Sequence, residues 1–371
     1  MSHLKQSRTH PSVFLQWILN LRRILVKKIQ YNASNELIKS KFFEMLENAK
    51  GRDPKTVDSY VKAIHEFEVY TKFIDFKKFS TKLAVGFKEY LSNKKNKRTG
   101  EAISMSYLQH CTSQVREFFE WLSRQKGYDR HIQYDDAQYF TLTRNNRNRA
   151  RATNFQESYT IEEIITTIRN MPASTPIEMR NKAMISLMLL TAPRISALQT
   201  ARLGSIKYFK SFDAWAFVQN PNLVATKFAK NITAYFIGNV PDLHKNVLDF
   251  VAFLKEQSFT DKCPLFPRMV SSFTSEGLPC LILEKEFIRS QPVIRAIFKR
   301  AFQANELPYH KPHTFRHAIT RKMMQSVKSP LLISNLAQNL GQEKDQGVII
   351  SAYGASPEHE RAGILKAFEL E

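Results

Sequence analysis

The 371-residue sequence lacks the features that mark secreted, zinc-binding and membrane-spanning proteins. Its three cysteines, Cys111, Cys263 and Cys280, are odd in number and form no C-x-x-C pair, which predicts neither a disulfide framework nor a zinc site. The longest apolar run, at 183–192, is too short to cross a bilayer. The basic N-terminal stretch has no small-residue cleavage site of the kind that ends a signal peptide. These absences favour a protein of the reducing cytoplasm.

Glycine and acidic residues are also scarce. With 11 glycines and no G-x-G-x-x-G or Walker loop, the sequence offers no turn that would cradle a nucleotide. Only 34 acidic residues stand against 55 lysines and arginines, which leaves a net charge of +21. Such an excess repels itself unless a polyanion compensates it. The composition therefore favours a nucleic-acid partner over an anionic membrane surface or an ordinary basic enzyme.

The apolar periodicity predicts a mainly α-helical protein with one small antiparallel β-sheet. We expect a basic extension or arm at residues 1–40, a helical bundle at 41–143, a basic linker at 144–158 and a second domain at 159–371. The extension contains one amphipathic stretch. It would be either an arm that touches DNA or a partner subunit, or an additional packed helix.

Helix starts and apolar faces predict the bundle. Asp53 followed by Pro54 is typical of an N-cap with proline at the first helical position. Leu83, Phe87 and Leu91 follow one another at intervals of four residues, as side chains on one face of a helix do. These signals favour several short helices packed around one core.

The region between the two domains is rich in arginine. Residues 144–151 contain four arginines and no acid, which suits an extended segment that follows a phosphate backbone; a solvated interdomain loop is the alternative. Thr160 and Glu163 then have the spacing of a capping box, so a helix of the second domain is expected to begin there.

The small sheet is expected in the first half of the second domain. Three runs rich in β-branched and aromatic residues predict its strands, at 215–219, 222–227 and 232–237. Turn-like sequences separate them, so the strands are expected to be antiparallel.

Two arginines and a histidine in the second domain have the chemistry that phosphodiester cleavage without a metal requires. Arg194 follows the apolar run after a Thr-Ala-Pro break, at a predicted helix junction. His313 comes directly after Pro312 and Arg316 lies three residues further on, so in the first turn of a helix they can reach one phosphate together. Each residue alone is as readily explained by a structural role. The three residues become informative only as a set, through their order along the chain and the sequence around each of them.

This order resembles the tyrosine recombinase family, the phage-type integrases and their relatives. The family's first box, G-x-R-x-S-E-L, appears here as A-P-R-I-S-A-L, with Arg194, Ser196 and Leu198 in place. Ala197 stands where the family has Glu, and Ser205 where it has Asp. Neither acid is a family catalyst, so their loss removes structural hydrogen bonds near the arginine.

The second and third boxes resemble the family more closely than the first. H-x-L-R-H appears as H-T-F-R-H, from His313 through Arg316 to His317. The third box is L-G-H followed about ten residues later by a tyrosine, and it appears as L-G-Q followed by Tyr353. Gln342 replaces the usual His or Trp, and its side-chain amide can still donate a hydrogen bond but carries no charge.

The resemblance implies a fold, a helical core-binding bundle followed by a tyrosine-recombinase catalytic domain, and a role for each residue. Four side chains would hold the scissile phosphate: Arg194, His313, Arg316 and Gln342. Tyr353 would be the nucleophile that forms a 3′-phosphotyrosyl intermediate. The family's general acid is a lysine in a β-hairpin between the first two boxes, which implies Lys227, with Lys230 as its rival.

The resemblance also implies the partners. Double-stranded DNA is the expected substrate, with self-association into a tetramer on DNA through the C-terminal tail and accessory DNA-bending proteins as further partners. The predicted tail helix starts near Ser356 and Pro357; it would pack either on a neighbouring subunit or on its own domain. We expect no metal, cofactor or membrane, because cationic side chains take the electrostatic role of a metal. A prokaryotic, nucleoid-associated location is implied.

The implied activity is site-specific cleavage and rejoining of DNA through a four-way junction, in the integration, excision or transposition of a mobile element. Two alternatives stay open. A type IB topoisomerase-like enzyme would use the same residues and reseal the same strand. A relative without activity would act only as a DNA-binding factor, which Gln342, Ala197 and Ser205 suggest.

Overall fold

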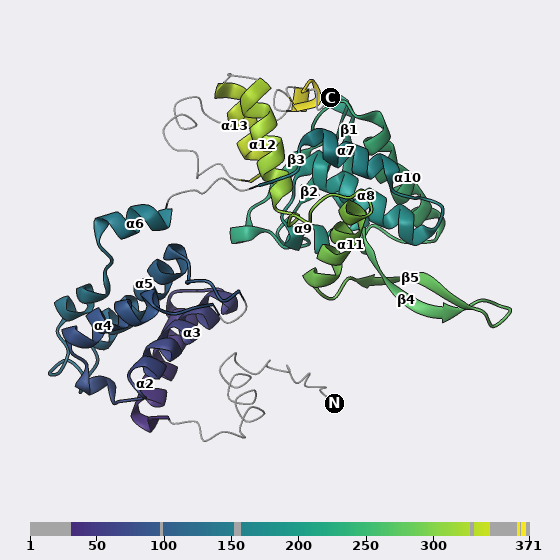
Figure 1. Ribbon diagram of the computed structural model, residues 1–371. Coiled ribbons are helices and arrows are strands. Elements are labelled where there is room, and N and C mark those ends of the chain that lie inside the picture. Colours follow the sequence, from purple (N-terminus) through teal and green to yellow (C-terminus); the bar gives the residue numbers. More distant parts are fainter. Residues whose placement is uncertain are drawn as a thin grey trace, which may run out of the picture. The chain divides into compact units, whose positions relative to one another are not determined.

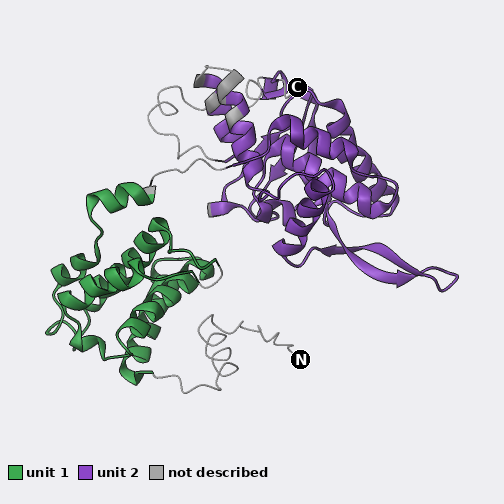
Figure 2. Cartoon of the chain, viewed as in Figure 1, with its two compact units in different colours: residues 1–154 green, residues 155–371 purple. Residues whose placement is uncertain are grey.

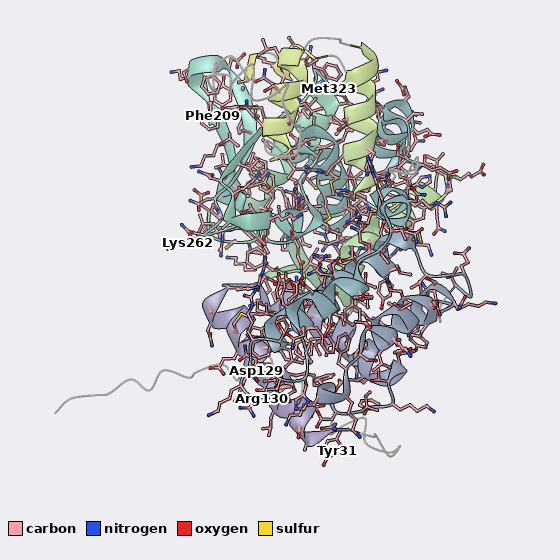
Figure 3. All side chains as sticks on the ribbon, turned by 90° about the vertical axis from the view of Figure 1, so that its left-hand side faces the viewer. Tyr31, Asp129, Arg130, Phe209, Lys262 and Met323 are labelled. Carbon is pink, nitrogen blue, oxygen red and sulfur yellow. The ribbon has the colours of Figure 1, made fainter. Side chains whose placement is uncertain are left out.

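The computed structural model describes residues 31–96, 99–151, 157–326, 330–341, 362–363 and 365–368. The chain divides into two compact units, residues 1–154 and residues 155–371 (Figure 2). Tyr31 marks the start of the described part of the first unit, and Phe209 and Met323 lie in the second (Figure 3). As predicted, the described elements are mainly helices with small antiparallel sheets (Figure 1).

The first unit is helical. Its elements are α2 (Ala33–Glu44), the π-helical turn η1 (Met45–Ala49), α3 (Pro54–Tyr70), η2 (Phe76–Lys78), α4 (Thr81–Ser92), α5 (Met105–Leu122), η3 (Tyr134–Phe140) and α6 (Arg144–Arg151). The predicted start of α3 is confirmed, since the Asp53 side chain accepts a hydrogen bond from the Lys55 amide and Pro54 opens the helix. Phe87 and Leu91 are buried on α4, as the periodicity indicated.

Aromatic rings fill the core of this unit. The ring of Phe67 on α3 meets those of Phe87, Phe119 and Phe140 edge to face, with centroids 5.1, 5.2 and 5.6 Å apart. Each such pair contributes about 0.5–1.5 kcal/mol beyond the area it buries. The cluster thus holds α3, α4, α5 and η3 together.

The bundle begins earlier than predicted. Residues 33–40 form the first part of α2, whose Ile38 and Phe42 are buried in the core. The polar composition of this segment hid the helix, because Lys39 also points inward and forms a 2.6 Å ion pair with the buried Glu68. The amphipathic stretch expected within residues 1–30 lies outside the described residues.

The arginine-rich residues 144–151 are also different from the prediction, since they form helix α6 and not an extended segment. Thr143 precedes this helix and its side chain accepts a hydrogen bond from the Asn146 amide, 3.3 Å away. The helix packs on α5, where the Ser106 hydroxyl donates to the Ala150 carbonyl at 2.7 Å. Arginine is a good helix former, so the helix needs no apolar stripe of its own once α5 supports it.

The second unit combines helices with two antiparallel sheets. Its elements are α7 (Ile161–Asn170), α8 (Pro176–Thr191), α9 (Ile195–Gln199), η4 (Leu203–Ser205), β1 (Ile206–Phe209), η5 (Lys210–Phe212), β2 (Ala214–Gln219), η6 (Lys227–Ala229), β3 (Ile232–Tyr235), α10 (Pro241–Glu256), β4 (Pro267–Phe273), β5 (Pro279–Phe287), α11 (Gln291–Gln303), α12 (Thr314–Ser326) and α13 (Pro330–Asn339). The predicted capping box is confirmed, because the side chains of Thr160 and Glu163 each accept from the other's amide.

The three-stranded sheet has the order β1-β2-β3. Two predicted runs cover most of β2 and all of β3, but the prediction of a strand at 222–227 was wrong, because the third strand is β1 at Ile206–Phe209. Asn220 explains the error: its side chain accepts from the Asn222 amide and its carbonyl from the Val224 amide, which makes a turn. Residues 220–231 thus form one long connection between β2 and β3.

A second hairpin, β4–β5, was not predicted and projects from the unit as a two-stranded ribbon (Figure 1). Its apolar side chains include Phe273 and Leu281, which are exposed, so the burial that usually marks a strand is absent. At its base the buried Arg180 of α8 donates from Nη1 to the Pro267 carbonyl at 2.8 Å.

Candidate active site

Arg194 lies where the chain passes from α8 to α9. Ala192 ends α8 in the left-handed conformation, with φ of 41° and ψ of 50°, and is fully buried. Pro193 follows, and Arg194 is the N-cap residue of α9. Its side chain is half-buried. The turn at Ala192 therefore places Arg194 just beyond the C-terminal end of the buried helix α8.

Arg316 joins the three boxes. It lies in the first turn of α12 and is 4% exposed. Its Nη1 donates to the carbonyl of Ala192 and its Nη2 to the carbonyl of Leu340, both at 2.7 Å. Its Nε has no hydrogen-bond partner among the described residues. One guanidinium thus fixes the segment before Arg194 and the end of the α13 region together.

Burial, and then the charge of Arg194, lower the pKa of Arg316 to about 10. The group still carries its charge at neutral pH. Burial also lowers the pKa of His313, with the charges of Arg316, His317 and Arg194 as further causes. Because the charge of Arg194 acts on both residues, the structure brings Arg194, His313 and Arg316 into one electrostatic environment.

His313 stands just before α12, and its carbonyl accepts the Arg316 amide at 3.2 Å. More than a third of His313 is exposed to solvent and the rest is covered by neighbouring groups, which is the partial burial that lowers its pKa; Arg316, in contrast, is buried. The ring of His317, one turn further on, lies edge-on to it with centroids 5.4 Å apart. Only the histidine of the H-x-x-R pair therefore faces outward, where a ligand can meet it.

The third box approaches the site through Gly341. Its φ of +63° lies in the left-handed region, and a Cβ there would collide with the side chain of Ile232 and lie 3.9 Å from Nη1 of Arg194. Just before it, Asn339 fixes the end of α13 on β3: its Oδ1 accepts the Tyr235 amide at 2.7 Å and its Nδ2 donates to the Tyr235 carbonyl at 3.0 Å. The segment is therefore held close to Arg194.

The two candidate lysines occupy different positions in the connection between β2 and β3. Lys227 is exposed at the first position of η6. Lys230 is half-buried, and its Nζ donates to the carbonyl of Gly341 at 3.3 Å. Both belong to a loop that reaches the site, and Lys230 touches the third box.

Two predicted site residues, Gln342 and Tyr353, lie outside the described residues. So do Ser356 and Pro357, at the predicted start of the tail helix. The described part of the tail packs on its own unit, where Ala362, Leu365 and Phe368 are buried and the Gly238 amide donates to the Leu365 carbonyl at 3.2 Å. The Nζ of Lys366 also donates to the Asp213 carbonyl at 2.7 Å.

The positions where the family has acids are closed. Ala197 is 1% exposed and Ser205 is 6% exposed. An acid at either place would be buried and would need a partner. Sequence reasoning missed the carbonyl groups of Ala192 and Leu340 as the acceptors of Arg316, since a main-chain acceptor leaves no trace in residue type.

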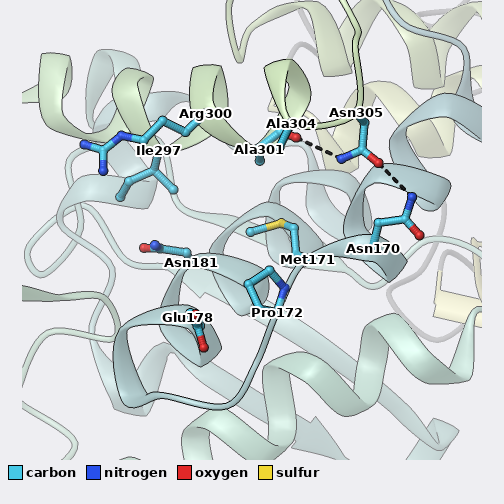
Figure 4. Close-up of a pocket in the computed structure, with 10 residues that line it drawn as sticks. All are labelled: Asn170, Met171, Pro172, Glu178, Asn181, Ile297, Arg300, Ala301, Ala304 and Asn305. Carbon is cyan, nitrogen blue, oxygen red and sulfur yellow. Dashed lines mark hydrogen bonds between the residues drawn. The ribbon is translucent and has the colours of Figure 1, made fainter.

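A cavity of about 360 Å³ lies elsewhere in the same unit, between the α7–α8 connection and α11 (Figure 4). Met171, Pro172, Ile297 and Arg300 are among its lining residues. None of the described site residues lines it. It is therefore separate from the candidate active site.

In the described part of the chain, no group of three or more His, Cys, Asp and Glu side chains is arranged to hold a metal ion. Among the same residues, no helix has the length and apolar character needed to cross a membrane.

Comparison with known proteins agrees with this architecture. Residues 38–126 match the phage integrase SAM-like domain. The XerH site-specific recombinase bound to difH substrate, in a pre-cleavage complex, is 11% identical with a TM-score of 0.53, over 92% of this chain and 91% of that one. A lambda integrase tetramer bound to a Holliday junction is 12% identical with a TM-score of 0.52, over 94% and 91%.

A lambda integrase (75–356) dimer bound to a COC′ core site is 14% identical with a TM-score of 0.51, over 86% of this chain and 94% of that one. No protein of curated function matches the sequence. At such low identities the likeness establishes the fold, and it covers both units.

Proposed function

From the premise that this chain has the tyrosine recombinase fold, with a phage integrase SAM-like domain at residues 38–126, we propose that it is a site-specific DNA recombinase. It would cleave and rejoin double-stranded DNA through a 3′-phosphotyrosyl intermediate, as an integrase does. The observation that carries the proposal is the convergence of three segments on Arg316, beside Arg194 and His313.

Two guanidinium groups and an imidazole in one environment suit a phosphodiester. An arginine presents up to five N–H donors in a planar fork that matches phosphate oxygens and keeps its charge. Arg316 uses two of its nitrogens on carbonyl groups and remains protonated at neutral pH. Arg194 and the outward-facing His313 would take the non-bridging oxygens, and the Gln342 amide would add one uncharged hydrogen bond.

The chemical step would begin with Tyr353. Its hydroxyl gives its proton to water and its oxygen attacks the phosphorus; a bond forms between them, and the bond from phosphorus to the 5′ oxygen breaks. Lys227 gives a proton to that leaving oxygen, which becomes a free 5′-hydroxyl. The ester to tyrosine retains the energy of the broken bond, so the 5′-hydroxyl of a partner strand can attack it and release the enzyme without ATP.

DNA binding and assembly would follow from charge and from the fold. The net charge of +21 supplies the phosphate contacts from which most of the affinity for a duplex comes. Four copies of the protein would assemble around two duplexes, and the exchange of DNA strands would pass through a four-way junction. The reaction would serve the integration, excision or transposition of a mobile element in a prokaryotic cell.

Covalent trapping tests the proposal. A library of duplexes with a nick beside the candidate cleavage position lets the cleaved fragment diffuse away, so that an active enzyme stays joined to DNA. We expect a protein–DNA adduct that resists denaturation for the wild type and none for Tyr353→Phe, while both bind duplex DNA equally.

The same assay separates the alternatives. If no adduct forms on any sequence and Tyr353→Phe behaves as the wild type does, the protein is a DNA-binding factor and the catalytic proposal is wrong. A topoisomerase-like enzyme would form the adduct and relax supercoiled DNA, but would join no pair of recognition sites.

A further inference from the structure

Lys230 makes a contact that a general acid does not need. Its Nζ donates to the carbonyl of Gly341, 3.3 Å away and 111 residues later in the chain. Gly341 directly precedes Gln342, the proposed phosphate ligand. The side chain therefore links the β2–β3 connection to the third box.

The contact belongs to a pair. The carbonyl groups of Leu340 and Gly341 are consecutive; the first accepts Nη2 of Arg316 and the second accepts Nζ of Lys230. The main chain turns at Gly341, whose φ is left-handed, and the Ile232 side chain leaves no room for a Cβ there. Two cations and a tight contact thus hold the main chain that leads into Gln342.

Lys227 lies in the same short turn of the β2–β3 connection as Lys230. It is three residues before Lys230, at the exposed start of η6, and Ala229 between them has a φ of +49°. The bond from Lys230 fixes the later end of this turn. Lys227 and Lys230 thus lie at opposite ends of one short turn, and the bond to Gly341 is made at the Lys230 end.

We propose that Lys230 is a positioning residue, which holds the Gly341 peptide beside Arg194, on the phosphate side of the site, by joining it to the β2–β3 connection. The inference rests on the proposed function. An ammonium group has three N–H donors, and here one is directed to a main-chain carbonyl. The proton for the leaving oxygen comes from Lys227.

The leaving atom distinguishes the two roles. A nicked substrate whose 5′-bridging oxygen is replaced by sulfur releases a thiolate, which leaves without a proton. Loss of the general acid, or of its placement, is therefore corrected by sulfur, whereas displacement of the Gly341 peptide beside Arg194 is not. The variants are Lys227→Ala, Lys230→Met and Lys230→Arg, each measured as the rate of adduct formation on both substrates.

We expect Lys227→Ala to cleave the oxygen substrate about 10²–10⁴-fold more slowly than the wild type and the sulfur substrate at nearly the wild-type rate. Lys230→Met should cleave both substrates more slowly by a similar factor, up to about 10²-fold. Lys230→Arg, which can still donate to the Gly341 carbonyl, should recover most of the rate. Lys230→Arg should bind duplex DNA and melt at nearly the wild-type temperature. This variant therefore still tests the inference if Lys230→Met folds poorly.

Four outcomes contradict the inference. Rescue of Lys230→Met by sulfur would mean that Lys230 acts on the leaving oxygen, as the acid or through Lys227, and not through Gly341. Wild-type rates of Lys230→Met on both substrates, or a Lys230→Arg variant that is folded and as slow as Lys230→Met, would remove the positioning role. A wild-type protein that forms no adduct with either substrate contradicts the proposed function itself, and the role of Lys230 with it.

Discussion

The guanidinium of Arg316 donates a 2.7 Å hydrogen bond to the carbonyl of Ala192, which lies 124 residues earlier in the chain. This bond fixes the start of α12 against the end of α8, two residues before Arg194. A second bond from the same group reaches Leu340. The relative placement of the three boxes therefore depends on one buried side chain.

Arg316→Lys should lower both the stability and the activity of the protein. A lysine keeps the charge but has no fork to reach two carbonyl groups, so at least one buried acceptor loses its donor at a cost of about 1–3 kcal/mol. We expect a lower free energy of unfolding and adduct formation slower by at least about 10²-fold. Arg295→Lys, an exposed arginine bonded to Gln291, is the matched control and should be close to neutral. Equal stabilities of the two variants would show that the bonds to the carbonyl groups contribute little.

Ala192→Gly should stabilise the protein. Ala192 has a φ of 41°, where an L-residue is strained by about 1–2 kcal/mol and glycine is not. The larger freedom of glycine in the unfolded chain and the loss of the buried methyl group offset most of the gain, which leaves at most about 0.5 kcal/mol. Ala183→Gly, in the interior of the same helix, should instead destabilise by about 1 kcal/mol. Chemical denaturation of both variants checks the contrast, and a loss for Ala192→Gly would refute it.

A comparison of Gly341→Ala with Gly277→Ala separates the cost of a positive φ from the cost of a steric collision. Gly341 and Gly277 both have positive φ, +63° and +76°, but a Cβ at Gly277 meets nothing within 4 Å, whereas one at Gly341 meets Ile232. Gly277→Ala should cost about 1 kcal/mol and leave cleavage unchanged. Gly341→Ala should cost about 1–3 kcal/mol more and slow cleavage, since the peptide before Gln342 must shift. Melting temperatures and adduct rates measure the difference; identical behaviour would mean that the third box tolerates displacement.

The stability of the second unit should fall in mild acid, in part through His313. The pKa of His313 is lowered in the folded protein, chiefly by burial and then by nearby cations, so the unfolded chain binds its proton more readily. Its contribution is fully present above the unfolded pKa, about 6.5, and is lost as the pH falls from there toward the folded pKa. His313→Gln should lose less stability than the wild type between about pH 7 and pH 5. Parallel pH profiles of unfolding would contradict the placement of His313 beside Arg194 and Arg316.

Local signals predicted much of the fold. Asp53 with Pro54, and Thr160 with Glu163, gave the starts of α3 and α7 because capping depends on residues a few positions apart. Long-range partners explain the failures. Lys39 is buried in α2 because Glu68, 29 residues away, compensates it, and no periodicity rule anticipates an inward lysine.

The candidate site was predictable as a set of side chains but not as an arrangement. The boxes pointed to Arg194, His313 and Arg316, and the structure brings these together. That Arg316 would be buried on main-chain carbonyl groups, and that Lys230 rather than Lys227 would reach Gly341, depends on how α8, α12 and the β2–β3 connection pack. Such contacts are decided by the tertiary fold.

The most direct test of the account is to identify the atom that carries the DNA. Mass spectrometry of the protease-digested adduct from a nicked substrate reports which peptide holds the nucleotide. We predict that the nucleotide is joined through its 3′-phosphate to Tyr353. An adduct on another residue, or none from a wild-type protein that binds the same DNA, would contradict the central claim that this chain cleaves DNA through that tyrosine.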